Sequence, residues 1–112
     1  MTTASPRAPR TPTGGRWSAD EESVTALQDG AQLRYRFAGS EVYLVMDGPA
    51  GAKVRVHVEG MDSPGGADVQ GETVTLSGAR LYRLVRLPQA TEGATVTLTF
   101  DAGVRANAFT FG

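Results

Sequence analysis

The sequence predicts an all-β fold, an antiparallel β-sandwich of the jelly-roll type with about eight short strands. The first observation is a period of two between apolar and polar residues in several segments, clearest at residues 53–59, which is typical of half-buried strands. The second is the supply of fourteen glycines and six prolines, which place turns between these segments. The third is the lack of any sustained helical stripe. Short strands at regular spacing favour a sandwich or barrel.

The chain divides into a linker and one domain. We expect residues 1–15 to be a disordered linker or tail, because after Met1 they contain no large apolar residue to bury. A basic arm that touches an acidic partner is the alternative. We expect residues 16–112 to form a single domain, since that length supports one core without disulfides. The net charge is −1, with +3 on residues 1–16 and −4 on the rest, so no basic field points to nucleic acid.

The first half of the domain reads as strands and turns. As the only tryptophan, Trp17 is expected to cover the edge of the core, and residues 23–28 to form a short strand. Turn residues follow at Asp29-Gly30, before an alternating strand over 32–37. A turn at 38–40 should then lead into a strand over 41–46. Both faces of this last strand are apolar, which predicts a central position.

The second half contains one ambiguous segment. Residues 53–59 predict a regular strand, residues 60–66 a long loop, and residues 74–76 a short strand. Residues 80–87 fit either a helix, with arginines at near-helical spacing, or a strand; we expect a strand because all neighbouring segments are β. Pro88 should end it.

Residues 94–112 predict two strands that meet across one turn. Apolar residues alternate with threonines over 95–100, turn residues follow at 101–103, and Phe109 and Phe111 then share one face of the returning strand. The two strands form the expected end of the domain.

Composition argues against catalysis. The chain has no cysteine, which removes thiol redox chemistry and thiolate metal sites. Its one histidine, His57, lies on the outer face of a regular strand, whereas a general base needs a cleft and an orienting partner. The acids at 20–22 lack the spaced oxygen ligands of a calcium loop. We therefore expect no enzyme activity, no cofactor and no metal.

No membrane insertion is expected either. No apolar run approaches the roughly 20 residues of a membrane span. The N-terminal residues also lack the apolar region of a secretory signal.

Binding is the easier function to build from these residues. Outward side chains of two strands form a polar face that contains Arg34, Arg36, Arg55 and His57. Together with the ring of Tyr43 or Tyr82, such a face offers the planar surfaces and forked donors that sugars use. Tyrosines at these positions also serve core or edge packing.

Several segments carry a family resemblance. Arg80-Leu-Tyr-Arg-Leu-Val85 and the terminal Gly103-Val-Arg-Ala-Asn-Ala-Phe-Thr-Phe-Gly112 resemble the C-terminal domain of DipZ-type thioredoxin-like proteins, which are associated with cytochrome c biogenesis. The resemblance extends back to Trp17. It implies a domain that follows a thioredoxin domain and is similar to jelly-roll carbohydrate-binding modules, with a non-catalytic accessory role outside the cytoplasm. The sequence departs from the family at Asn107, where a tyrosine is usual, and at Glu59-Gly60, where an Asp-Gly turn is usual.

Two hypotheses of function follow from the residues and the resemblance together. In the first, the domain binds carbohydrate, with Tyr82, Asp68, Arg83 and His57 as the candidate contacts, and an aromatic side chain should be exposed beside polar groups. In the second, it is an interaction domain that packs on a thioredoxin-like protein, and an apolar patch should be exposed.

Overall fold

The computed structural model describes residues 14–19, 23–61 and 64–112, and within these it is all-β. Its seven strands pair antiparallel throughout, in the order β1-β2-β7-β3-β6-β4-β5. They are β1 (Trp17–Ala19), β2 (Val24–Ala26), β3 (Ala31–Asp47), β4 (Lys53–Val58), β5 (Thr73–Thr75), β6 (Arg80–Phe100) and β7 (Arg105–Phe111). Residues 1–13 of the linker expected over 1–15 lie outside the described residues. The acidic residues at 20–22 lie outside them as well.

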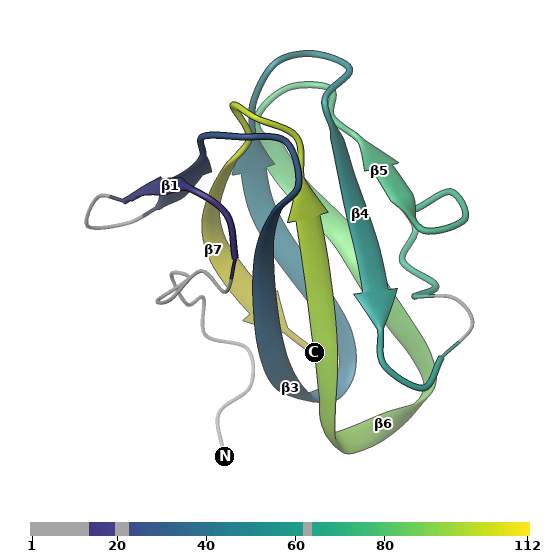
Figure 1. Ribbon diagram of the computed structural model, residues 1–112. Coiled ribbons are helices and arrows are strands. Elements are labelled where there is room, and N and C mark those ends of the chain that lie inside the picture. The colour runs from purple at the N-terminus through teal and green to yellow at the C-terminus, as the bar shows by residue number, and fades with distance from the viewer. Residues whose placement is uncertain (1–13, 20–22, 62–63) are drawn as a thin grey trace.

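Two long strands curl this sheet into a sandwich. Figure 1 shows β3 and β6 bending at the same end of the molecule, so that each contributes to both layers. The front layer contains residues 31–37 of β3, residues 94–100 of β6, and strands β4 and β5. The back layer contains residues 41–47 of β3, residues 80–86 of β6, and strands β7 and β2. The predicted all-β sandwich is confirmed, although two pairs of expected short strands are each one continuous strand.

The bends explain two errors in the expected boundaries. The predicted turn at 38–40 is a bend within β3, where Gly39 has a φ of 119° and the register with β6 shifts on both sides. Pro88 lies inside β6 and does not end it. In the bend, Gly39 pairs with Thr91 and Glu41 with Arg86, so the residues between Arg86 and Thr91 have no partner in β3. A proline is tolerated there because no ladder hydrogen bond needs its N–H.

The terminal strands do not form the expected pair. Strand β7 pairs with β3 and β2, not with β6, so the turn at 101–103 carries the chain from the front layer to the back layer. Gly103 has a φ of 91° in this turn. The predicted shared face of Phe109 and Phe111 is nevertheless right, and it is the buried face of β7.

The ambiguous segment at 80–87 is a strand, as expected. Tyr82, Leu84, Val85 and Leu87 are buried, and the arginines between them are exposed. A register shift opposite Val42 and Tyr43 accounts for two consecutive buried residues, Leu84 and Val85. This β-bulge is what gives the sequence its helix-like spacing.

The core fills the space between the layers. The ring of Tyr35 in the front layer lies 4.8 Å from that of Phe109 and 5.2 Å from that of Phe111 in the back layer. Trp17 packs edge-on against Phe100 at 5.2 Å and donates from Nε1 to the Gly14 carbonyl at 2.7 Å. The expectation that Trp17 covers the edge of the core is confirmed.

Candidate functional site

A groove of about 550 Å³ lies on the outer face of the back layer, and we call it the Tyr43 groove. Tyr43 is in β3, and its cross-strand partners are Arg83 in β6 and Thr110 in β7, so the three side chains share one row across the sheet. The ring of Tyr43 is half-buried, whereas the side chain of Arg83 is exposed. The groove is lined by Glu41, Tyr43, Gly66, Ala67, Leu81, Arg83, Val85, Arg86 and Thr110.

Residues 64–68 form one wall of the groove by lying along β6. Arg86 donates its backbone N–H to the Pro64 carbonyl at 2.8 Å, and Gly65 forms a β-bridge with Val85. Gly66 is required by close approach, because a Cβ there would collide with the carbonyl oxygen of Arg83. The wall is thus fixed by backbone contacts.

Asp68 fastens the end of this wall. Its carboxylate accepts from the backbone N–H of Arg83 at 2.7 Å and from the guanidinium of Arg80 at 3.0 Å. Partial burial opposes ionisation of this carboxyl, but the hydrogen bonds and the nearby positive charges of Arg80 and Arg83 outweigh it and lower the pKa of Asp68 below its ordinary value. Asp68 is therefore a charged tether between the wall and β6.

The structure brings together two of the four predicted site residues. Arg83 lines the Tyr43 groove, and Asp68 holds the backbone of Arg83. Tyr82 is fully buried on the opposite face of β6, so its ring is not available for the stacking contact we expected. His57 lies in the front layer, where its Nδ1 is 3.5 Å from a carboxylate oxygen of Glu72.

Sequence reasoning missed most of the groove. Tyr43 was one of two candidate rings, but Glu41, Arg86 and Thr110 carried no signal of their own. These residues meet only because β3 pairs with both β6 and β7. The alternation within residues 41–46 does place Tyr43 on the face of the strand that is opposite to the buried face of Leu44. This was the clue in the sequence that Tyr43 lies on the outer face.

The polar face expected from Arg34, Arg36, Arg55 and His57 lies on the front layer, and two of its four side chains have a carboxylate neighbour. A guanidinium nitrogen of Arg34 lies 3.6 Å from a carboxylate oxygen of Glu59, and Nδ1 of His57 lies 3.5 Å from a carboxylate oxygen of Glu72. Within the part of the chain that the structure describes, no three His, Asp or Glu side chains gather in a way that could hold a metal ion.

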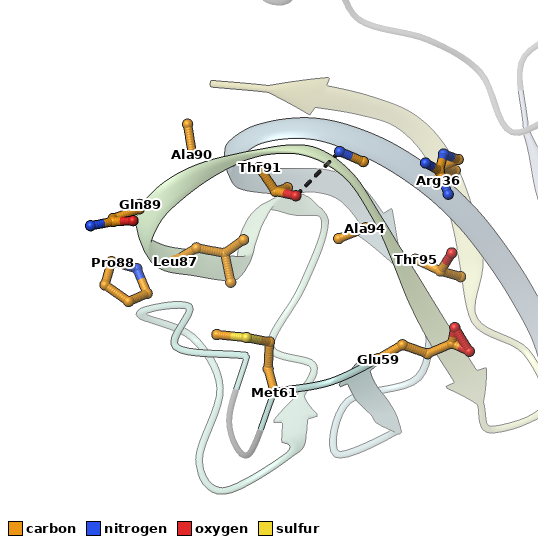
Figure 2. A pocket seen from close by; sticks show the side chains of 11 residues that line it. Arg36, Glu59, Met61, Leu87, Pro88, Gln89, Ala90, Thr91, Ala94 and Thr95 are labelled. Atoms are coloured by element: carbon orange, nitrogen blue, oxygen red, sulfur yellow. Dashed lines mark hydrogen bonds between the residues drawn. The ribbon is translucent and has the colours of Figure 1, made fainter.

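A second hollow, the corner pocket, lies where β6 bends, and it has about 620 Å³. Figure 2 shows Leu87 and Pro88 toward one end and Arg36 and Glu59 toward the other, with Met61 below. None of its lining residues is aromatic. It therefore offers no ring for a sugar to stack on.

The comparison with protein families decides the relationship. A family model described as the thioredoxin-like C-terminal domain matches residues 2–112. The chain belongs to this family. The resemblance found in the sequence is thereby confirmed, whereas a role in cytochrome c biogenesis is not shown by it. No curated protein matches the chain significantly.

Several solved structures share the fold of this domain. A family two carbohydrate esterase from Cellvibrio japonicus superposes with a TM-score of 0.78 at 16% identity, covering 99% of this chain and 34% of the esterase. A family two carbohydrate esterase from Clostridium thermocellum, in complex with cellohexaose, superposes with a TM-score of 0.67 at 17% identity, covering 88% of this chain and 30% of the esterase. CsCBM6-3 from Clostridium stercorarium, in complex with cellobiose, superposes with a TM-score of 0.60 at 13% identity, covering 97% of this chain and 93% of CsCBM6-3. The domain thus spans about a third of each esterase and has the jelly-roll fold of family 6 carbohydrate-binding modules.

No part of the described chain (14–19, 23–61 and 64–112) forms a helix that could span a membrane.

Proposed function

We propose that this domain is a non-catalytic module that binds carbohydrate in the Tyr43 groove. The observation that carries the proposal is the half-buried ring of Tyr43, open to the outer face and bordered by a guanidinium, a carboxylate and a hydroxyl, those of Arg83, Glu41 and Thr110. The apolar face of a sugar ring packs on an aromatic side chain, and its hydroxyls need donors and acceptors at the rim. The groove supplies both.

Its size and rigidity fit the same role. A volume of about 550 Å³ lies within the range of roughly 300–1,000 Å³ that is typical of small-ligand sites. Three paired strands and the Asp68 tether hold the lining residues before any ligand arrives, which reduces the entropy lost on binding. The structural neighbours determined with cellohexaose and cellobiose add support at the level of the fold.

An NMR titration tests the proposal. Isotope-labelled protein is titrated with a panel of neutral and acidic oligosaccharides, and backbone amide shifts are followed. We expect saturable shifts at Tyr43, Arg83 and Thr110. Replacing the ring by Tyr43→Ala should weaken binding about tenfold, the value of an aromatic contact.

His57→Ala is the matched control, because His57 was a predicted contact but lies in the other layer. It should leave the affinity unchanged. Saturable shifts centred on His57, or on the corner pocket, would move the site away from the Tyr43 groove. A silent panel at millimolar sugar would overturn carbohydrate binding altogether.

A second candidate function is docking on a thioredoxin-like protein. Ala108, Val45 and the groove-lining Leu81 are cross-strand neighbours on the same outer face, and Leu81 is 40% exposed. An apolar row of this kind suits a protein interface. In this case Ala108→Asp, at a position outside the groove lining, should abolish amide shifts caused by an added thioredoxin domain, whereas Tyr43→Ala should weaken sugar binding about tenfold and leave those shifts in place.

A further inference from the structure

The charges around the Tyr43 groove are unlike those of the domain as a whole. Residues 17–112 carry a net charge of −4. The groove itself is lined by two arginines, Arg83 and Arg86, and one acid, Glu41. A positive binding site on a negative domain indicates a ligand that carries negative charge.

These two arginines differ from three others in the described chain. Arg34, Arg80 and Arg105 each form an ion pair with a carboxylate. The guanidinium groups of Arg83 and Arg86 form no hydrogen bond or ion pair with any described residue, and both side chains are exposed. The donors of both remain available to a ligand.

The strand pairing places both arginines beside Tyr43 on the outer face of the sheet. Arg83 is the cross-strand partner of Tyr43, and Arg86 is the partner of Glu41, two positions along β3. Residues two apart on a strand share a face and lie about 7 Å from each other. The guanidinium groups therefore border one continuous surface with the ring.

Glu41 limits how much negative charge the groove accepts. It faces Arg86 across the strands without forming an ion pair among the described residues. Its charge disfavours a densely anionic polymer, yet its oxygens accept hydrogen bonds from sugar hydroxyls. Asp68 adds little, since Arg80 neutralises it.

From this arrangement, and resting on the proposed carbohydrate function, we propose that the Tyr43 groove selects glycans containing a uronic acid. The sugar ring lies on Tyr43, the carboxylate accepts from Arg83 and Arg86, and a hydroxyl donates to Glu41. Guanidinium and carboxylate are matched in shape for paired hydrogen bonds, which are stronger than those to a neutral acceptor. The net negative charge of the domain repels an anionic ligand only weakly, because salt at physiological ionic strength screens charges that lie more than about 8 Å apart.

The test compares sugars that differ only in charge. Trigalacturonate and glucuronic-acid-branched xylotriose are each titrated against their own methyl esters, with the full chain and amide shifts as the readout. We expect the acidic member of each pair to bind about tenfold more tightly at low salt, given that each exposed ion pair contributes about 0.2–1 kcal/mol. The preference should shrink as salt is raised.

Variants assign the preference to the two arginines. Arg83→Gln and Arg86→Gln should each reduce the difference between acid and ester while leaving binding of the ester nearly unchanged. Arg55→Gln is the control, since Arg55 is an exposed arginine in the front layer that forms no ion pair with the described residues.

The outcomes separate the two proposals. Equal binding of acid and ester at the Tyr43 groove would overturn the uronic acid inference but keep the carbohydrate function. Failure of all four sugars to bind would overturn the uronic acid inference, and a silent wider panel of oligosaccharides would overturn the carbohydrate function as well. An acid preference that survives in Arg83→Gln and Arg86→Gln would also overturn the inference, because the charge would be read elsewhere.

Discussion

Two tyrosines in neighbouring strands show how one residue type takes two roles. Tyr82 is buried, and its hydroxyl donates to the Gly78 carbonyl at 2.6 Å and accepts from the Ser77 N–H at 2.9 Å. Tyr43 points to the opposite face of the sheet and borders the groove. The difference comes from which face of the sheet each position occupies. Tyr82 therefore serves core packing, and Tyr43 is the tyrosine of the proposed binding site.

Two single substitutions test whether the two tyrosines have these different roles. Tyr82→Phe removes a hydroxyl with two backbone partners, leaves them unsatisfied, and should lower the free energy of unfolding by about 1–3 kcal/mol in urea denaturation. It should not change sugar affinity. Tyr43→Phe, the control, should leave stability within about 0.5 kcal/mol. Equal stability of both variants would contradict the structural role of Tyr82.

Asp68 should make stability depend on pH. Its pKa is lower in the folded protein than the ordinary value of about 3.9, so its contribution is present above that value and is lost as the pH falls through the folded pKa. Asp68→Asn should be about 1 kcal/mol less stable than the native chain at pH 7. The difference in the free energy of unfolding between the two proteins should begin to shrink below about pH 4 and disappear once the pH is below the folded pKa of Asp68. A difference that persists undiminished in acid would show that the charge of Asp68 is not what holds the wall.

At the scale of elements, the groove depends on how closely one segment approaches β6. Gly66→Ala places a Cβ against the Arg83 carbonyl and the Leu84 backbone. We expect the wall at 64–68 to move outward, with loss of the Asp68 hydrogen bond, a destabilisation of about 1–3 kcal/mol and weaker sugar binding. Thermal unfolding and the titration measure the two effects.

Ala67→Ser is the control for the wall, since Ala67 is exposed in the same segment. Its stability should stay within about 0.5 kcal/mol of the native chain. A Gly66→Ala variant as stable as this control would mean that the close approach is unimportant.

At the scale of the whole molecule, β3 and β6 join the two layers into one cooperative unit. Both strands pair in the front and in the back layer, so neither layer can open without breaking strands that the other needs. We expect a single two-state unfolding transition. Tryptophan fluorescence reports Trp17 against Phe100, and far-UV circular dichroism reports all strands. The two curves should coincide in urea, and a separate early fluorescence transition would show that β1 detaches first.

The sequence by itself determined the fold class, most strand positions, the shared face of Phe109 and Phe111, and the strand at 80–87. Each of these follows from local alternation and turn residues. Only the tertiary structure decided that β3 and β6 run on through their bends, because Gly39 and Pro88 fit a bend within a strand as well as a turn or a strand end. It also decided the groove. Tyr43, Arg83 and Thr110 are far apart in the chain and meet through strand pairing, which no local pattern records.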